Sequence, residues 1–224
     1  MAARSISSHP APGARARVAA KRDSARTRQQ ILTAAIEEFS RHGFSGARVE
    51  TIVTRAKCNM RMIYHHFKDK EGLYIAALEA VYEEIRTAEQ QLDLEHLEPV
   101  AAMKKLVEFT VDHFAAHPGF VRLTSTENLH KGKYIKASSR IPAMSSPLID
   151  TLRMVLKRGE TSGLFRRGTD PLKLYITIVA LSCHHLNNGY TLSATFQTDI
   201  RSEAWQHDWK GHVVRVVLSF LQAK

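Results

Sequence analysis

Residues 49–74, VETIVTRAKCNMRMIYHHFKDKEGLY, constrain the fold most, because their apolar side chains recur at helical intervals in two short runs. In the second run Ile63 and Phe67 lie one turn apart, and Asn59 can accept backbone N–H groups just before it. The stretch predicts two short helices joined by a turn of three to four residues. The first run shares one helical face through Val49, Ile52, Val53 and Ala56.

A longer helix is predicted before this stretch. Its apolar stripe can begin at a cap formed by Asp23 or Ser24 and can end at Gly43. The stripe consists of Ile31, Leu32, Ala35 and Phe39. These residues can bury the apolar faces of the two short helices and close a three-helix unit.

Helical periodicity also continues after the stretch. Asp69 can cap a long helix from Lys70 to about Leu92, and the segment 93–99 connects it to the next. The run VVRVVLSFLQ near the end has strand propensity, but no other strand is available to pair with it. The fold class is therefore all-α. Further helices are predicted over about 99–116, 119–129, 147–162, 170–192 and 208–222.

Charge divides the chain into unequal parts. Residues 1–70 hold 14 Lys/Arg against 5 Asp/Glu, a net of +9, whereas the remainder holds 18 against 17, a net of +1. A basic module on a neutral body favours a polyanionic partner such as nucleic acid. We predict a flexible basic arm over 1–21, a basic domain over 22–70 that binds nucleic acid, and a larger, nearly neutral domain over 71–224.

Targeting signals are weak. The N-terminus lacks the apolar run of a secretory signal, and no run reaches the roughly 18 residues needed to cross a bilayer. The Arg- and Ser-rich composition of the N-terminus is compatible with a transit peptide as well as with a plain disordered arm. Cys58 and Cys183 lie far apart without metal-ligand spacing, which is typical of a reduced protein. The expected location is the cytoplasm, without a membrane partner.

Two short helices with a tight turn form the helix-turn-helix of DNA-binding proteins, whose second helix fits the major groove. Burial of the apolar set would leave a basic and aromatic face on that helix. Arg61 can bridge guanine O6 and N7, and the methionines can touch thymine methyl groups. The alternative is a helical hairpin whose basic face is merely solvated. The expected outward side chains are Met60, Arg61, Met62, Tyr64 and His65.

Residues 26–74 resemble the tetracycline-repressor family of bacterial transcriptional regulators. The similarity runs from Arg28-Gln-Gln-Ile-Leu-Thr-Ala-Ala through Gly43-Phe44 and Ile52 to Ile63-Tyr-His-His-Phe-Lys-Asp-Lys-Glu-Gly-Leu73. This resemblance implies about nine helices, with a helix-turn-helix DNA-binding domain over 22–70 and an effector-binding and dimerisation domain over 71–224. It further implies a homodimer, a double-stranded operator with two related half-sites, and release by a small molecule. It also implies that bases are contacted by Met60, Arg61 and Met62, and phosphates by Tyr64, His65 or His66, and Lys70.

Three departures from the family pattern affect the DNA-binding unit. The turn, often Ala-Gly-Val-Ser, is Ala56-Lys57-Cys58-Asn59, so Lys57 must adopt a conformation that favours glycine. Arg48 stands where a Ser or Thr cap is frequent and can contact phosphate through its longer side chain. The positions after the turn, often Lys-Gly-Thr, are Met60-Arg61-Met62 here, so an unusual operator sequence is expected. Basic residues of the arm can also follow the DNA backbone, or the arm can remain a solvated tail.

Two predicted helices, 170–192 and 208–222, carry more apolar surface than a monomer needs to hide. In the resembled family the last two helices pair across a two-fold axis, which implies the homodimer contact here. The alternative is that they only complete the monomer core. The apolar residues concerned are Leu172, Tyr175, Ile176, Val179, Cys183, Val213, Val217, Phe220 and Leu221.

Polar residues inside apolar helices are the candidates for binding a small organic effector of unknown identity. Each of them alone can equally be a surface residue or a satisfied core residue. The candidates are Glu127, Asn128, His130, Tyr175, His184 and Asn187, with His185 and Asn188 beside them.

No metal or cofactor is expected. His113 and His117 have a chelating spacing, but no third ligand is evident and Pro118 follows at once, which favours a helix-end histidine pair. No GxxxxGK[ST], GxGxxG, HExxH or GxSxG motif occurs, so nothing positive supports an enzyme. Two functions remain: an effector-controlled repressor, and a constitutive or architectural DNA-binding protein without a ligand.

Overall fold

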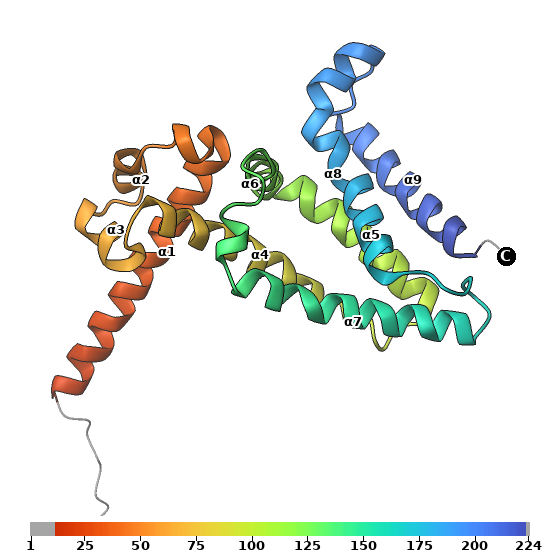
Figure 1. Cartoon of the computed structure of the whole chain (residues 1–224), viewed down its shortest axis with the longest axis horizontal. Helices are drawn as coiled ribbons and strands as arrows, with labels where there is room; N and C mark the ends of the chain where they lie inside the picture. The colour runs from red at the N-terminus through yellow and green to blue at the C-terminus, as the bar shows by residue number, and fades with distance from the viewer. Residues whose placement is uncertain (1–11, 223–224) are drawn as a thin grey trace, which may run out of the picture.

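A computed structural model describes residues 12–222, which form nine α-helices and one short 3₁₀ helix without any strand. This confirms the predicted all-α fold (Figure 1). Within the same residues no helix is both long and apolar enough to cross a membrane. The elements are α1 (Pro12–Gly46), α2 (Val49–Arg55), α3 (Met60–Phe67), α4 (Lys70–Gln90), α5 (Pro99–Ala116), α6 (Pro118–Leu129), η1 (Ile135–Ala137), α7 (Arg140–Thr161), α8 (Pro171–Phe196) and α9 (Glu203–Gln222).

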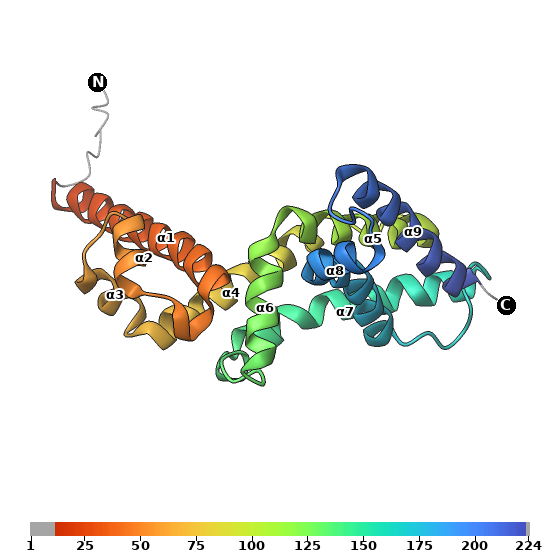
Figure 2. The ribbon, with the colours of Figure 1, turned by 90° about the horizontal axis from the view of Figure 1, so that it is seen from above.

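The helices form two parts joined by α4 (Figure 2). Helices α1 to α3 make a compact unit at one end, and α5 to α9 gather with the rest of α4 at the other. Apolar side chains that are almost wholly buried fill each part, among them Phe39 and Ile63 in the first and Leu106 and Ile178 in the second. The predicted stripe of the first helix and the faces of the two short helices are thus confirmed as core.

The first helix is longer than predicted. Residues 12–21, which we expected to belong to an unstructured arm, continue α1 as helix, and residues 1–11 lie outside the described residues. The Ala- and Arg-rich composition explains this, because both residue types have high intrinsic helix propensity even without an apolar face. At the other end Gly43 breaks the helix as predicted, with a φ of 64° inside the span.

Helix boundaries follow local capping. The side chains of Asn59 and Asp69 accept the backbone N–H groups of Met62 and Gly72 at 3.2 and 2.7 Å, which confirms both predicted caps. Helix α7 begins at Arg140 instead of 147 and runs through Pro147. The N-cap residue Ser139 makes no side-chain bond, but the hydroxyl of Ser138 just before it accepts the N–H of Arg140 at 3.2 Å.

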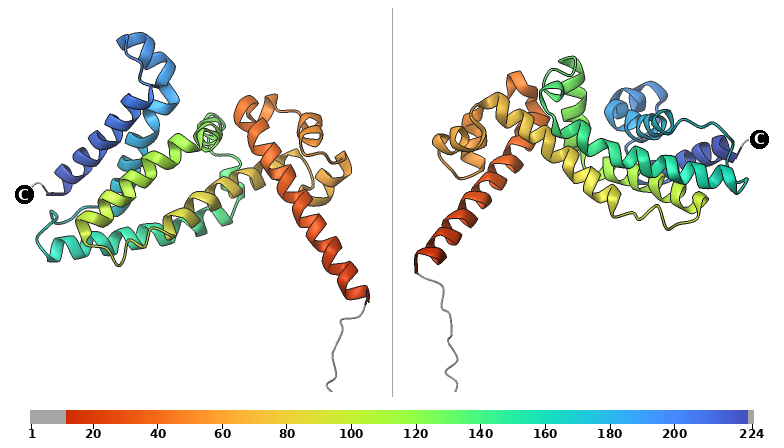
Figure 3. Two further views of the ribbon diagram at one scale, coloured as in Figure 1. Left: turned by 180° about the vertical axis from the view of Figure 1, so that it is seen from behind. Right: turned by 60° about the horizontal axis from the view of Figure 1, so that its bottom comes forward.

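The two parts meet along α1, which packs against α6 and α4 (Figure 3). Four aromatic rings fill this junction: Phe39 and Phe44 from the first part, Tyr74 at the start of α4, and Tyr134 after α6. Neighbouring centroids lie 4.6 to 5.3 Å apart, within the range of favourable ring contacts. The larger part is therefore in contact with α1 through packed aromatic side chains as well as through α6 itself.

Candidate functional site

The turn between α2 and α3 is held by short-range hydrogen bonds. The N–H of Cys58 donates to the carbonyl of Val53 at 3.2 Å, and Lys57 adopts the left-handed conformation with a φ of 51°. The predicted conformational demand on Lys57 is thereby confirmed. Cys58 packs against the core of the unit, and burial raises the pKa of its thiol. The turn orients α3 with its apolar side, Ile63 and Phe67, buried.

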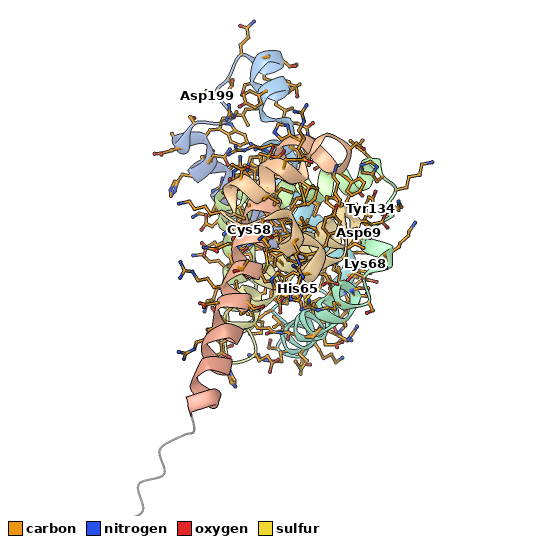
Figure 4. The ribbon with its side chains drawn as sticks, turned by 90° about the vertical axis from the view of Figure 1, so that its left-hand side faces the viewer. Cys58, His65, Lys68, Asp69, Tyr134 and Asp199 are labelled. Atoms are coloured by element: carbon orange, nitrogen blue, oxygen red, sulfur yellow. The ribbon has the colours of Figure 1, made fainter. Side chains whose placement is uncertain are left out.

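The outward side of α3 carries the polar face that the sequence predicted, with one difference. Arg61, Tyr64 and His65 are exposed, and Tyr64 leaves 60% of its surface in solvent. Met60 and Met62 were also expected to face outward, but both are half-buried, and Met62 packs against the core of the unit. Figure 4 looks onto this end of the molecule. A groove of DNA would therefore meet an arginine, a phenol and an imidazole first.

The two neighbouring histidines have different environments. His65 is exposed, whereas Nε2 of His66 is buried without a hydrogen-bond partner. Burial, followed by the nearby charges of His65 and Arg28, lowers the pKa of His66. A neutral ring facing inward is poorly suited to bind phosphate, so the structure favours His65 over His66 for that role.

Lys70, the other predicted phosphate ligand, is partly engaged within the protein. Its ammonium donates to the carbonyl of Ala47 at 2.7 Å and lies 5.0 Å from the ring centroid of Phe44. These contacts hold the start of α4 against Ala47, the residue before Arg48, and against Phe44. The ammonium retains further N–H donors for a phosphate oxygen.

A buried carboxylate that sequence reasoning missed supports the start of α2. Arg48 is exposed and provides no side-chain cap, but its backbone N–H donates to Oε1 of Glu38 at 3.1 Å. Glu38 is 3% exposed, and its second oxygen lies 3.8 Å from the guanidinium of Arg55. Its place on the apolar stripe, seven residues after Ile31, is the signal that could have revealed it.

The structure does not bring the six predicted effector ligands together. Glu127 accepts the backbone N–H groups of Tyr134 and Ile135 at 2.7 and 3.1 Å, so it stabilises the turn after α6. His130 lies near the ring of Tyr134 in the same region. Asn128, His184 and Asn187 are exposed, and Asn187 bonds to Ser125 of α6 at 3.1 Å.

Tyr175 belongs to a separate polar cluster between α4 and α8. Arg86 donates to Glu89 at 2.5 Å and to the Tyr175 hydroxyl at 2.8 Å, and that hydroxyl donates to Glu89 at 3.0 Å. Burial raises the pKa of Glu89 to about 7 even though Arg86 opposes the shift. Sequence reasoning missed Arg86 and Glu89. Glu89 follows the buried Ile85 by one helical turn, which was a usable signal.

The histidine pair of α5 lies beside this cluster. The rings of His113 and His117 stack with centroids 4.1 Å apart, and Nε2 of His117 lies 3.1 Å from Glu84. Burial, then His117 and Arg86, lower the pKa of His113 to about 4. Among the described residues no group of three or more His, Cys, Asp or Glu side chains is arranged to hold a metal ion.

Comparison with known proteins adds independent information on both parts of the chain. Residues 31–77 match the bacterial regulatory proteins of the tetR family, and residues 99–217 match the tetracyclin repressor-like C-terminal domain. The HTH-type transcriptional repressor NicS of Pseudomonas putida is 39% identical over 184 residues, covering 82% of this chain and 87% of that protein. The HTH-type transcriptional regulator RutR of Escherichia coli is 25% identical over 203 residues, covering 88% and 91%.

A solved structure has the same architecture. The transcriptional regulator SCO4942 of Streptomyces coelicolor superposes with a TM-score of 0.65 at 26% identity, covering 88% of this chain and 99% of that one. The helix-turn-helix unit, the larger helical domain and these matches agree. The chain belongs to the tetracycline-repressor (TetR) family of DNA-binding bacterial transcriptional regulators.

Proposed function

We propose that the protein is a repressor that binds a palindromic operator as a homodimer and is released by a small organic effector. The observation that carries the proposal is the face of α3, where exposed Arg61, Tyr64 and His65 project from a helix fixed by Asn59. Arginine supplies base recognition, and the phenol and imidazole suit phosphate contacts. The name of NicS, a transcriptional repressor, supports the direction of regulation.

Exposed apolar residues on the last two helices support a homodimer. Leu172 and Ile176 on α8 are 52% and 57% exposed, and Val216 and Phe220 on α9 are 39% and 47% exposed. Burying such side chains against a second copy is favourable by roughly 25 cal/mol per Å² of apolar surface. Three other residues that we assigned to this face lie instead in the core of the monomer, namely Val213, Val217 and Leu221.

The dimer would place two α3 helices one DNA turn apart, roughly 34–36 Å. In the mechanism we propose, the effector favours a second arrangement of the larger domain, in which this spacing is wrong. The junction of α1 with α6 and α4 is the path by which the change reaches α3. The effector shifts the balance only by its difference in affinity for the two arrangements.

Selection of bound duplexes from a random pool would identify the operator and its symmetry. With that operator, Arg61→Ala combined with Tyr64→Ala should weaken binding at least about 30-fold, given roughly 1–3 kcal/mol for each good contact. Arg153→Ala on α7 is the matched control, since this exposed arginine pairs with Asp150 one turn before it on the same helix. Unchanged binding by the double variant, or a strictly monomeric protein by light scattering, would contradict the proposal.

Constitutive DNA binding is the alternative. The observation that favours it is the buried apolar interior of the larger domain, where Leu106, Ile178 and Val213 have no exposed surface. A screen of metabolites for release of the operator separates the two functions. Release by a metabolite supports effector control, whereas tight binding throughout the screen favours the constitutive protein.

A further inference from the structure

A cleft of about 320 Å³ lies where α5 and α6 meet α8 and the segment before α9. Its apolar lining includes Phe114 of α5, Val121 of α6 and Tyr190 of α8, and Arg122 and Arg201 add two cations. No aspartate or glutamate lines it. The volume is within the range of small-molecule sites, which begins at roughly 300 Å³.

The guanidinium groups of Arg122 and Arg201 are available to bind an anion. Neither guanidinium forms an ion pair with any of the described residues. Arg201 lies over the ring of Tyr190, 3.9 Å from its centroid. The carboxylate of Asp199 accepts the backbone N–H of Arg201 at 3.0 Å and forms no ion pair with the Arg201 guanidinium. Two unpaired guanidiniums beside apolar surface favour an organic anion.

His185 supplies a buried polar group to the same cleft and is only 3% exposed. Its Nε2 faces Oε1 of Gln206 at 2.8 Å, and Gln206 donates through its own nitrogen to the carbonyl of Ile200 at 2.7 Å. The amide orientation therefore places the imidazole proton on Nε2. Nδ1 is then an acceptor, and it is buried without a hydrogen-bond partner among the described residues.

We propose that this cleft binds a small organic anion with an apolar body, whose carboxylate contacts Arg122 and Arg201. The apolar body packs against Phe114, Val121 and Tyr190. Arg86, which lies between α4 and α8, is a weaker candidate because its guanidinium charge is already paired with the carboxylate of Glu89 and bonded to the hydroxyl of Tyr175. Binding in the cleft does not depend on the proposed function. Only its role as the effector site rests on that function.

The position of the cleft suits an effector, because one of its walls is α6. Gly119 at the start of α6 lies against Ile36 and Ser40 of α1, and Thr126 approaches Gly43. An anion that drew Arg122 toward Arg201 would move α6 relative to α8 and so change its packing on α1. The α8–α9 loop itself, with Asp199, lies far from His65 and the DNA-facing end (Figure 4).

A matched set of probes tests the site on the full-length protein. The set is 2-naphthoate, its neutral amide and the cationic 2-naphthylmethylamine, which share a ring system and differ in charge. By calorimetry we expect the carboxylate to bind at least 10-fold more tightly than the amide. Arg122→Gln and Arg201→Gln should each weaken naphthoate binding at least 10-fold, and the control Arg153→Gln should not. Absence of naphthoate binding, equal affinity for the three probes, or insensitivity to both arginine variants would overturn the site.

A plugged cleft gives a second readout that leaves the charges in place. Ala115 is exposed and lines the cleft, so Ala115→Trp should abolish naphthoate binding while the thermal unfolding temperature stays near that of the parent. Undiminished binding by this folded variant would also overturn the site. Operator release is measured separately. Naphthoate that binds the cleft without releasing DNA would leave the binding site standing and contradict effector control through it.

Discussion

The backbone N–H of Arg48 donates to the carboxylate of Glu38, 3.1 Å away, and this bond ties the start of α2 to the buried side of α1. It replaces the side-chain cap that α2 lacks, since a carboxylate near a helix N-terminus satisfies a free N–H and is favoured by the helix dipole. The packing of α2 thus depends on a residue of another helix.

Glu38→Ala should lower the free energy of unfolding by about 1–3 kcal/mol, because it leaves the N–H of Arg48 without its acceptor. Glu38→Gln keeps an acceptor oxygen and should cost less. The adjacent Glu37 is the control, since its half-exposed carboxylate lies 3.5 Å from Arg55 and its removal should cost less than ~0.5 kcal/mol. Urea unfolding at pH 7 measures all three. Equal losses in the free energy of unfolding on removal of the Glu38 and Glu37 carboxylates would show that burial of Glu38 adds no stability.

Gly72→Ala should destabilise the joint between α3 and α4 by at least ~2 kcal/mol, because a Cβ there would overlap the backbone carbonyl of Phe67. Gly211 in α9 is the contrasting position. A Cβ on Gly211 would meet only the far end of Arg215 at 3.4 Å, so Gly211→Ala should stabilise by about 0.5–1 kcal/mol. Thermal unfolding of the two variants should give shifts of opposite sign.

Lys57→Gly should stabilise the protein by about 0.5–1 kcal/mol, because the φ of 51° costs an L-residue strain that glycine avoids. Lys57→Ala removes the ammonium but keeps the Cβ, so it should give no gain. Chemical unfolding of both variants distinguishes strain from charge. A gain of equal size in the alanine variant would assign the effect to the lysine charge.

Removal of residues 1–21 should weaken operator binding and reduce its salt dependence by the equivalent of roughly one to three phosphate contacts. The expectation rests on Arg15, Arg17 and Lys21, three cations that this truncation removes. Arg15→Gln with Arg17→Gln keeps the chain length and should give part of the same loss. An unchanged salt slope in the truncated protein would exclude the segment from DNA contact.

A contact could be predicted from the sequence when its two partners lie close together in the chain. The caps by Asn59 and Asp69 join residues that are three positions apart, so the local sequence was enough to predict both. The bonds from Lys70 to Ala47 and from Arg86 to Tyr175 span 23 and 89 residues. Such pairs are fixed by how helices pack, which the spacing of apolar residues leaves open.

The effector candidates illustrate the same limit. A polar residue within an apolar helix indicates that the group has a partner, but the sequence does not say which partner. Glu127 proved to bond to the backbone of Tyr134, and Tyr175 to Arg86 and Glu89. Arg122 and Arg201 drew no attention, because arginines on amphipathic helices and in loops look like ordinary surface residues.

Glu89 and His113 should give the protein two opposing dependences of stability on pH. The pKa of Glu89 is raised from 4.5 to about 7, so the folded state holds more protons and loses stability as pH rises through this window. The pKa of His113 is lowered from 6.5 to about 4, so the folded state holds fewer protons and loses stability as pH falls through that window. Between about pH 4.5 and 6.5 the two effects oppose each other.

Glu89→Gln should remove only the first effect, since glutamine keeps an acceptor for Arg86 and does not titrate. The free energy of unfolding of this variant, minus that of the parent, should therefore rise by on the order of 1–3 kcal/mol between pH 4.5 and 7. Urea unfolding of both proteins at half-unit pH steps measures the difference. A difference that stays constant across this range would mean that Glu89 titrates normally despite its burial.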